Sequence, residues 1–258
     1  MIIDSHCHLT YEPMSNALNE TIDRANKDGI KYMLTISTED KSFEQILKIV
    51  NGYKSVYGTY GIHPHEAKSH QHIKSIDIIN KVNQNKKIIG VGETGLDFYY
   101  NHSEKKDQIN SFEEHISAAQ EKNLPLIVHT RSAEKETLQI LEKHSKKKET
   151  KILIHCFTGT REFAFKLIDL GAYISASGVV TFKKSFDLAK TFKDLPNEKI
   201  LVETDAPYLA PVPLRGKPNE PSYIVHTVKF LSDLKKLSFN DFSNITTNNF
   251  LNLFGKLN

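Results

Sequence analysis

The stretch Phe112–His129, FEEHISAAQEKNLPLIVH, contains the two patterns that decide the fold of this 258-residue chain. Phe112, Ile116 and Ala119 recur at helical spacing among charged and amide residues, which predicts an amphipathic helix. The apolar run Leu126–His129 follows, and a short uninterrupted run of this kind is typical of a strand covered on both faces. A helix followed by such a strand indicates parallel strands joined by crossover helices.

The same alternation continues through the rest of the chain, as in the helical pattern of Phe43, Ile46, Leu47 and Val50. The strands that we expect are Ile2–Asp4, Tyr32–Ser37, Val56–Ile62, Ile88–Glu93, Leu126–His129, Ile152–His155, Ala172–Ala176 and Ile200–Glu203. Eight such units predict an α/β fold, the (β/α)₈ TIM barrel, for which ~250 residues is the usual length. Because no Gly/Ser/Pro linker divides the chain, we expect one domain over residues 1–258, with an extra helix near Phe239–Phe254.

The composition excludes several classes of protein. Hydrophobic residues make up 39% and charged residues 25%, as in ordinary soluble globular proteins, and no apolar run approaches the ~18 residues that span a membrane. Two cysteines are too few for a disulfide-stapled secreted protein, so we expect a cytoplasmic location. The net charge of +3 is too small for a very basic protein that binds nucleic acid independently of sequence. The basic run Lys143–Lys151 is interpreted as a solvated helix end. We expect no membrane association and no obligate protein partner.

Polar residues that can bind metal end several of the expected strands. The sequence Asp4-Ser5-His6-Cys7-His8 closes the first strand, and the strand period of two points both imidazoles to one side. The residues that we expect to form a metal site are His6, His8, Glu93, His129, His155 and Asp205, and His63 ends a further strand. Since active sites of barrel enzymes lie at the carboxyl ends of the strands, these side chains are expected to converge there.

Four histidines and two carboxylates exceed the four ligands of a structural zinc site. Two divalent cations that share a bridging carboxylate would use all six, and such a pair activates water for hydrolysis. The donor set suits zinc or manganese, and also iron or nickel, while magnesium is compatible where carboxylates dominate. The sequence therefore predicts a two-metal hydrolase.

A dinucleotide site is an alternative for Gly90-Val91-Gly92-Glu93-Thr94-Gly95, which matches Gly-x-Gly-x-x-Gly after a strand. A dinucleotide turn leads directly into a helix, whereas an aromatic loop over Leu96–His102 is expected here. Glu93 would also place a carboxylate against the pyrophosphate. The context disfavours nucleotide binding.

Seven motifs lie along the whole chain. They are Ile2–Leu9 (IIDSHCHL), Gly61–Pro64 (GIHP), Gly90–Asp97 (GVGETGLD), Pro125–Arg131 (PLIVHTR), His155–Gly159 (HCFTG), Glu203–Leu209 (ETDAPYL) and Arg215–Pro221 (RGKPNEP). Together and in this order they resemble the TatD-type deoxyribonucleases, which are metal-dependent barrel hydrolases of the wider amidohydrolase group. The chain departs from that family at Thr10, where an acidic residue or asparagine is usual, and at Lys135, where an acidic residue is usual. Neither is an expected ligand.

The resemblance implies a metal held by His6, His8, Glu93 and Asp205, and a second held by Glu93, His129 and His155, so that Glu93 bridges. It also implies DNA as substrate, with 3′ to 5′ removal of nucleotides from single-stranded ends. Asp205 is expected to orient the attacking water or to accept its proton, and Asp205 and His63 are the expected catalytic residues. Substrate contacts are expected from His63, Arg131, Arg215 and Lys217. Tyr99 or Tyr208 could stack on a base.

Two other functions are compatible with the same fold. The metal site does not by itself select the bond that is cleaved, so a hydrolase of another ester or amide, such as an aminoacyl-tRNA deacylase, is the first alternative. A protein that keeps the barrel fold but only binds, without catalysis, is the second alternative. The absence of a metal-ligating residue from the sequence would favour it. All six expected ligands are present in this sequence.

Overall fold

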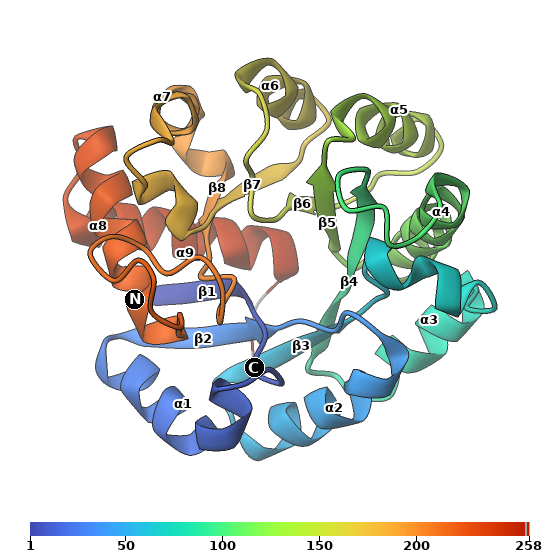
Figure 1. The fold of residues 1–258 in the computed structure, drawn as a ribbon, viewed down its shortest axis with the longest axis horizontal. Coiled ribbons are helices and arrows are strands. Elements are labelled where there is room, and N and C mark those ends of the chain that lie inside the picture. Colours follow the sequence, from blue (N-terminus) through green and yellow to red (C-terminus); the bar gives the residue numbers. More distant parts are fainter. Residues whose placement is uncertain (256, 258) are drawn as a thin grey trace. The chain divides into compact units, whose positions relative to one another are not determined.

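The computed structural model describes residues 1–255 and 257, and in this part of the chain eight strands alternate with helices (Figure 1). The strands are β1 Ile2–Cys7, β2 Ile30–Thr35, β3 Val56–Tyr60, β4 Ile88–Asp97, β5 Leu126–Arg131, β6 Ile152–Ile154, β7 Tyr173–Ala176 and β8 Ile200–Val202. The α-helices are α1 Leu18–Lys27, α2 Phe43–Gly52, α3 Ser75–Val82, α4 Lys105–Lys122, α5 Glu134–Ser145, α6 Arg161–Asp169, α7 Phe186–Asp194, α8 Ile224–Lys235 and α9 Phe239–Phe254. Short 3₁₀ helices are η1 Met14–Ala17, η2 Asp40–Ser42, η3 Pro64–His70, η4 Gly178–Thr181, η5 Asn197–Lys199 and η6 Pro221–Tyr223. None of the helices described is long and apolar enough to cross a bilayer.

This order of elements is the one predicted for a (β/α)₈ barrel. Each expected strand is present, and the extra helix α9 has the expected bounds. The strand ends differ by a few residues, because a strand continues for as long as its neighbour offers backbone partners. β2 begins at Ile30, two residues earlier than expected, since Ile30 is paired with Ile2 of β1.

The chain divides into two compact units. The first unit comprises Met1–Thr35, His155–Phe165 and Tyr173–Asn258, and the second comprises Ile36–Ile154 and Lys166–Ala172. In the first unit β1 is parallel to β2, and β7 is parallel to β8. A parallel bridge between Cys7 and Ala206 joins the end of β1 to the segment after β8.

The second unit is a parallel sheet in the order β3-β4-β5-β6. Helices α2 to α5 run along one side of these strands in Figure 1. All ten residues of β4 are buried. Each isoleucine or valine that is removed from water stabilises the folded state by about 2 kcal/mol. Burial on both faces accounts for the uninterrupted apolar runs on which the strand prediction rests.

The length of β4 corrects one expectation. The strand does not end at Glu93 but continues to Asp97, because Thr94 to Asp97 pair with Val128 to Arg131 of β5. Gly95 permits this pairing: its φ is +133°, and a Cβ there would lie 2.0 Å from the carbonyl oxygen of His129. The glycine motif thus lies inside a strand and is followed by a loop from Phe98, which is not the geometry of a dinucleotide turn.

His115 on α4 connects that helix to the segment after β3. Its Nδ1 lies 2.7 Å from the Ser111 carbonyl oxygen, and its Nε2 accepts a hydrogen bond from the Ile62 amide at 3.0 Å. The ring is therefore neutral, with its proton on Nδ1. Burial lowers the pKa of His115 to about 4.

We expect this histidine to make the fold sensitive to acid. Between pH 6.5, the ordinary pKa of histidine, and pH 4, the unfolded chain binds a proton at residue 115 that the folded chain does not bind. The contribution of His115 to the free energy of unfolding is therefore fully present above this range. It decreases by about 3 kcal/mol as the pH falls through the range. Urea denaturation of the wild type and of His115→Gln at pH 7.5 and 4.5 measures the effect. Equal losses of unfolding free energy in the two proteins would contradict it.

Candidate active site

Five buried or nearly buried polar side chains of the first unit lie close together, and we call them the first cluster: His6, His8, His155, Glu203 and Asp205. His6 lies on β1, and Glu203 and Asp205 follow β8. The Asp205 amide donates to the His6 carbonyl oxygen at 2.9 Å, and the His8 amide donates to that of Ala206 at 2.8 Å. These backbone bonds hold both histidines beside the carboxylate.

Three side-chain atoms of the first cluster form a triangle. Nε2 of His6 lies 3.3 Å from Nε2 of His8, and Oδ1 of Asp205 lies 3.6 Å from the first nitrogen and 3.3 Å from the second. Ligand atoms that are 2.0–2.1 Å from a tetrahedral cation are about 3.3 Å apart. The triangle therefore has the dimensions of three ligands around one divalent cation.

His155 and Glu203 complete the first cluster. The His155 ring stacks on the His6 ring with 3.9 Å between centroids, and its Nδ1 lies 3.4 Å from Oε1 of Glu203. The same Glu203 oxygen accepts a hydrogen bond from the Cys156 amide at 2.7 Å. One donor atom each from His6, His155 and Glu203 falls within 4.8 Å of the others, so Glu203 can also hold a cation.

The carboxylates of this unit differ in charge state. Burial disfavours ionisation of Asp205, but the hydrogen bond from His8 and the charges of His6 and His155 outweigh it and lower the pKa of Asp205. Asp205 is therefore ionised at neutral pH. In contrast, burial raises the pKa of Asp4 to about 7, although its oxygens accept bonds from the Thr204 amide and hydroxyl.

The second unit contains a second cluster, formed by His63, Glu93 and His129. Oε1 of Glu93 lies 3.4 Å from Nε2 of His63 and 3.2 Å from Nδ1 of His129. Each residue comes from a strand or its end: Glu93 from β4, His129 from β5, and His63 from the segment that follows β3. The donor spacing again matches ligands around one cation.

Asp97 supports the second cluster from behind. Its Oδ2 lies 3.2 Å from Nε2 of His129 and 2.9 Å from Nε2 of His65. Burial opposes ionisation of Asp97, yet these bonds and the Tyr100 amide hold its pKa well below the usual range. An ionised carboxylate only accepts, so His129 carries its proton on Nε2 and directs the lone pair of Nδ1 toward Glu93.

Divalent cations fit the residues that are present. Among the described residues no hydrogen-bond partner is found for Nδ1 of His8 or Oε2 of Glu203, although both atoms are buried. Buried polar atoms without partners are costly, and metal coordination is one way to satisfy them. Imidazole and carboxylate together suit zinc and manganese, and carboxylates also suit magnesium.

The expected ligands thus fall into both clusters: His6, His8, His155 and Asp205 lie in the first, and Glu93 and His129 lie in the second. Three of the expected substrate contacts, Arg131, Arg215 and Lys217, are exposed, whereas the fourth, His63, is 13% exposed at its side chain and lies in the second cluster. Arg131 packs over Tyr99 and Tyr100, Arg215 lies 4.4 Å from the centroid of Phe182, and Lys217 lies on the same loop as Arg215.

Two residues of the site were not expected from the sequence: Glu203, a member of the first cluster, and Asp97, which lies beside His129 of the second cluster. Glu203 ends the expected eighth strand, so the strand-end signal that identified the histidines also applies to it. Asp97 stands four residues after Glu93, which places both side chains on the same face of a strand once β4 is known to continue.

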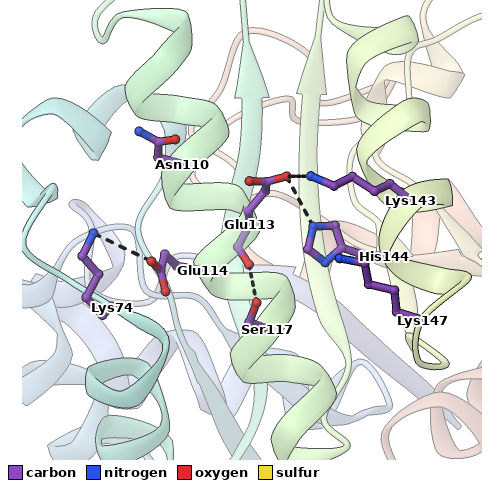
Figure 2. Close-up of a pocket in the computed structure, with 8 residues that line it drawn as sticks. All are labelled: Lys74, Asn110, Glu113, Glu114, Ser117, Lys143, His144 and Lys147. Carbon is purple, nitrogen blue, oxygen red and sulfur yellow. Dashed lines mark hydrogen bonds and ion pairs between the residues drawn. The ribbon is translucent and has the colours of Figure 1, made fainter.

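A separate pocket of about 450 Å³ is lined by residues of α4 and α5, together with Lys74 before α3 and Lys147 after α5 (Figure 2). Both of its carboxylates are paired with lysines: Lys143 is 2.7 Å from Oε1 of Glu113, and Lys74 is 3.7 Å from Glu114. Lys143 and Lys147 come from the basic run, and α5 ends at Ser145, as the interpretation of a solvated helix end requires. The pocket has none of the residues of either cluster and is not the candidate site.

Comparison with known proteins identifies the family. A family model described as TatD related DNase matches residues 3–255. An uncharacterized metal-dependent hydrolase of Buchnera aphidicola is 39% identical over 262 residues, which cover 98% of each chain. The 3′-5′ ssDNA/RNA exonuclease TatD of Salmonella typhimurium is 33% identical over 233 residues, which cover 88% of this chain and 89% of that protein.

A solved structure shows the fold. The structure of YJJV, a TatD homologue from Escherichia coli, superposes with a TM-score of 0.88 at 24% identity and covers 99% of this chain and 98% of that one. The fold class is therefore the (β/α)₈ barrel expected from the sequence. Since the family model spans nearly all of the sequence and two relatives exceed 30% identity over most of it, the chain belongs to the TatD-related DNase family of metal-dependent hydrolases.

Proposed function

We propose that this hydrolase removes nucleotides from the 3′ ends of single-stranded DNA. One observation carries the proposal: in both clusters carboxylate and imidazole atoms lie 3.2–3.6 Å apart, the spacing of ligands around divalent cations. The Salmonella relative is a 3′-5′ ssDNA/RNA exonuclease, which supports the choice of a phosphodiester bond and of the 3′ to 5′ direction.

The proposed ligand assignment follows the family resemblance. One cation would be held by His6, His8, Glu93 and Asp205, and the other by Glu93, His129 and His155. When bound, two divalent cations lower the pKa of a water molecule and neutralise charge on the phosphate. Zinc, magnesium and manganese are the candidates.

The remaining chemistry is assigned to side chains of the chain itself. Asp205, whose side chain is 13% exposed and ionised, orients the attacking water or accepts its proton. His63 lies 3.4 Å from Glu93, where it can donate to a phosphate oxygen beside the second cluster. Arg131, Arg215 and Lys217 are exposed cations, and we assign to them the phosphates of the bound strand.

The test uses metal-stripped protein reloaded separately with zinc, manganese or magnesium. A single-stranded oligonucleotide labelled at its 5′ end should give a descending ladder, and one labelled at its 3′ end should release a labelled mononucleotide first. A closed single-stranded circle should stay intact. Asp205→Asn, purified identically, controls for contaminating nucleases.

Two results would contradict the proposal. Rapid cutting of the circle would mean endonuclease action. If no metal supports DNA cleavage, the hydrolase acts on another ester or amide, and release of the amino acid from aminoacyl-tRNA would be the next measurement.

A further inference from the structure

Two tyrosines after β4 are unusually exposed for their size. Tyr99 is 61% exposed and Tyr100 is 49% exposed. Their rings meet edge to face, with 4.9 Å between centroids and an angle of 89°. Large aromatic faces left in water are costly, and when they lie beside an active site they indicate a surface that binds a ligand.

Arg131 lies against both rings. The centre of its guanidinium is 4.4 Å from the Tyr99 centroid and 4.7 Å from the Tyr100 centroid. Arg131 is exposed, and no acceptor for its guanidinium occurs among residues 1–255 and 257. The rings therefore hold a cation whose N–H groups remain available for an anion.

Asp97 links this aromatic surface to the second cluster. Its Oδ1 accepts hydrogen bonds from the amides of Tyr99 and Tyr100, both at 3.0 Å, while Oδ2 faces His129. The Phe98 amide donates to the Arg131 carbonyl oxygen at 3.0 Å, so the loop is also held against β5. The tyrosines and Arg131 are consequently fixed relative to His129, which precedes Arg131 by two residues on the same strand.

The two tyrosines have different surroundings. The Tyr100 ring stacks on His102 at 5.8 Å and meets His65 edge-on at 5.5 Å, so neighbouring rings support it. The ring contacts described for Tyr99 are with Tyr100 and Arg131. Tyr99, the more exposed of the two, therefore offers the more accessible ring surface.

We propose that Tyr99 and Arg131 form a subsite for one unpaired nucleobase and its adjacent phosphate, with Tyr100 supporting both side chains. A flat aromatic surface beside a guanidinium complements a base that is joined to an anion, and every base can stack in this way. Bases within a duplex are stacked on one another and cannot offer a free face. The inference rests on the proposed function and deepens it, because it makes the enzyme read an unpaired base as well as a phosphate.

The test compares wild type, Tyr99→Phe and Tyr99→Ala on oligonucleotides that carry one abasic residue at successive positions from the 3′ end. We expect Tyr99→Ala to raise KM by about tenfold, since stacking of one base on an aromatic ring is worth 1–3 kcal/mol. Tyr99→Phe should retain the wild-type KM. At one position the abasic residue should raise the KM of the wild type by the same factor of about ten. The same abasic residue should leave the KM of Tyr99→Ala unchanged.

Phe186→Ala is the matched control, because Phe186 is an aromatic residue that is 75% exposed on α7 and has no part in this subsite. If Tyr99→Ala is as sensitive to the abasic residue as the wild type is, the ring supports the loop and does not bind the base, which overturns the inference. Wild type that cleaves no DNA would instead contradict the proposed function.

Binding to metal-stripped protein separates these outcomes. Fluorescence anisotropy with a labelled phosphorothioate oligonucleotide should show a dissociation constant about tenfold higher for Tyr99→Ala than for the wild type. Equal dissociation constants would overturn the subsite even if no hydrolysis were observed with any metal.

Discussion

Replacement of Glu93 by glutamine is expected to lower hydrolysis by about a thousandfold, because cations contribute several kcal/mol of transition-state stabilisation and 1.4 kcal/mol is a factor of ten. Glu93 is 3% exposed. Its Oε1 lies 3.4 Å from Nε2 of His63 and 3.2 Å from Nδ1 of His129. Glutamine keeps the shape but offers a neutral oxygen and an N–H donor. If Glu93 serves two cations, Glu93→Gln should lose more bound metal than Asp205→Asn does.

Elemental analysis of the purified variants measures this loss directly. Asp205→Asn is the matched control, since it makes the same chemical change in the first cluster and is expected to lose most activity while it retains more metal. Thermal unfolding of both variants without metal shows whether either change disturbs the fold. Full metal occupancy in Glu93→Gln would refute the bridging role.

Local patterns in the sequence were sufficient to predict the order of the elements. The strand predictions rest on short apolar runs, and β1, β3 and β4 are indeed buried along their whole length. β2 and β5 are buried only in part, since Lys31 and Arg131 are exposed. The extra helix near Phe239–Phe254 was also predicted, and α9 has these bounds. The extension of β4 to Asp97 could not be predicted in this way, because it depends on pairing with β5, which is distant in sequence.

The candidate site could be predicted in part, because most of its metal-binding side chains stand at the ends of apolar runs in the sequence. His6, His8, His129, His155 and Asp205 each follow or end an apolar run, and the structure places them in the two clusters. The contacts of Arg131 with Tyr99 and Tyr100 could not be predicted, since they depend on a loop that is held by the carboxylate of Asp97.

Asp97→Asn is expected to weaken metal binding at the second cluster by 10- to 100-fold, which is the usual effect of removing the carboxylate behind a ligating histidine. In the wild type, Asp97 accepts from Nε2 of His129, so Nδ1 presents its lone pair toward Glu93. Asparagine can keep its oxygen on the amides of Tyr99 and Tyr100, but its NH₂ group then faces Nε2 of His129. That nitrogen must accept, the proton moves to Nδ1, and the lone pair needed for a cation is lost.

Titration of metal-stripped protein with zinc measures the affinity, and nitrogen NMR of His129 reports which ring nitrogen carries the proton. His65→Asn is the control, because it removes the other partner of Oδ2, at 2.9 Å, and leaves the contact between Asp97 and His129 in place. We expect that variant to keep the Nε2-protonated form of His129 and nearly all of its affinity. If Asp97→Asn binds zinc as tightly as the wild type does, or if His129 remains protonated on Nε2, then Asp97 does not set the tautomer. Its hydrogen bonds to the loop would then be its main contribution.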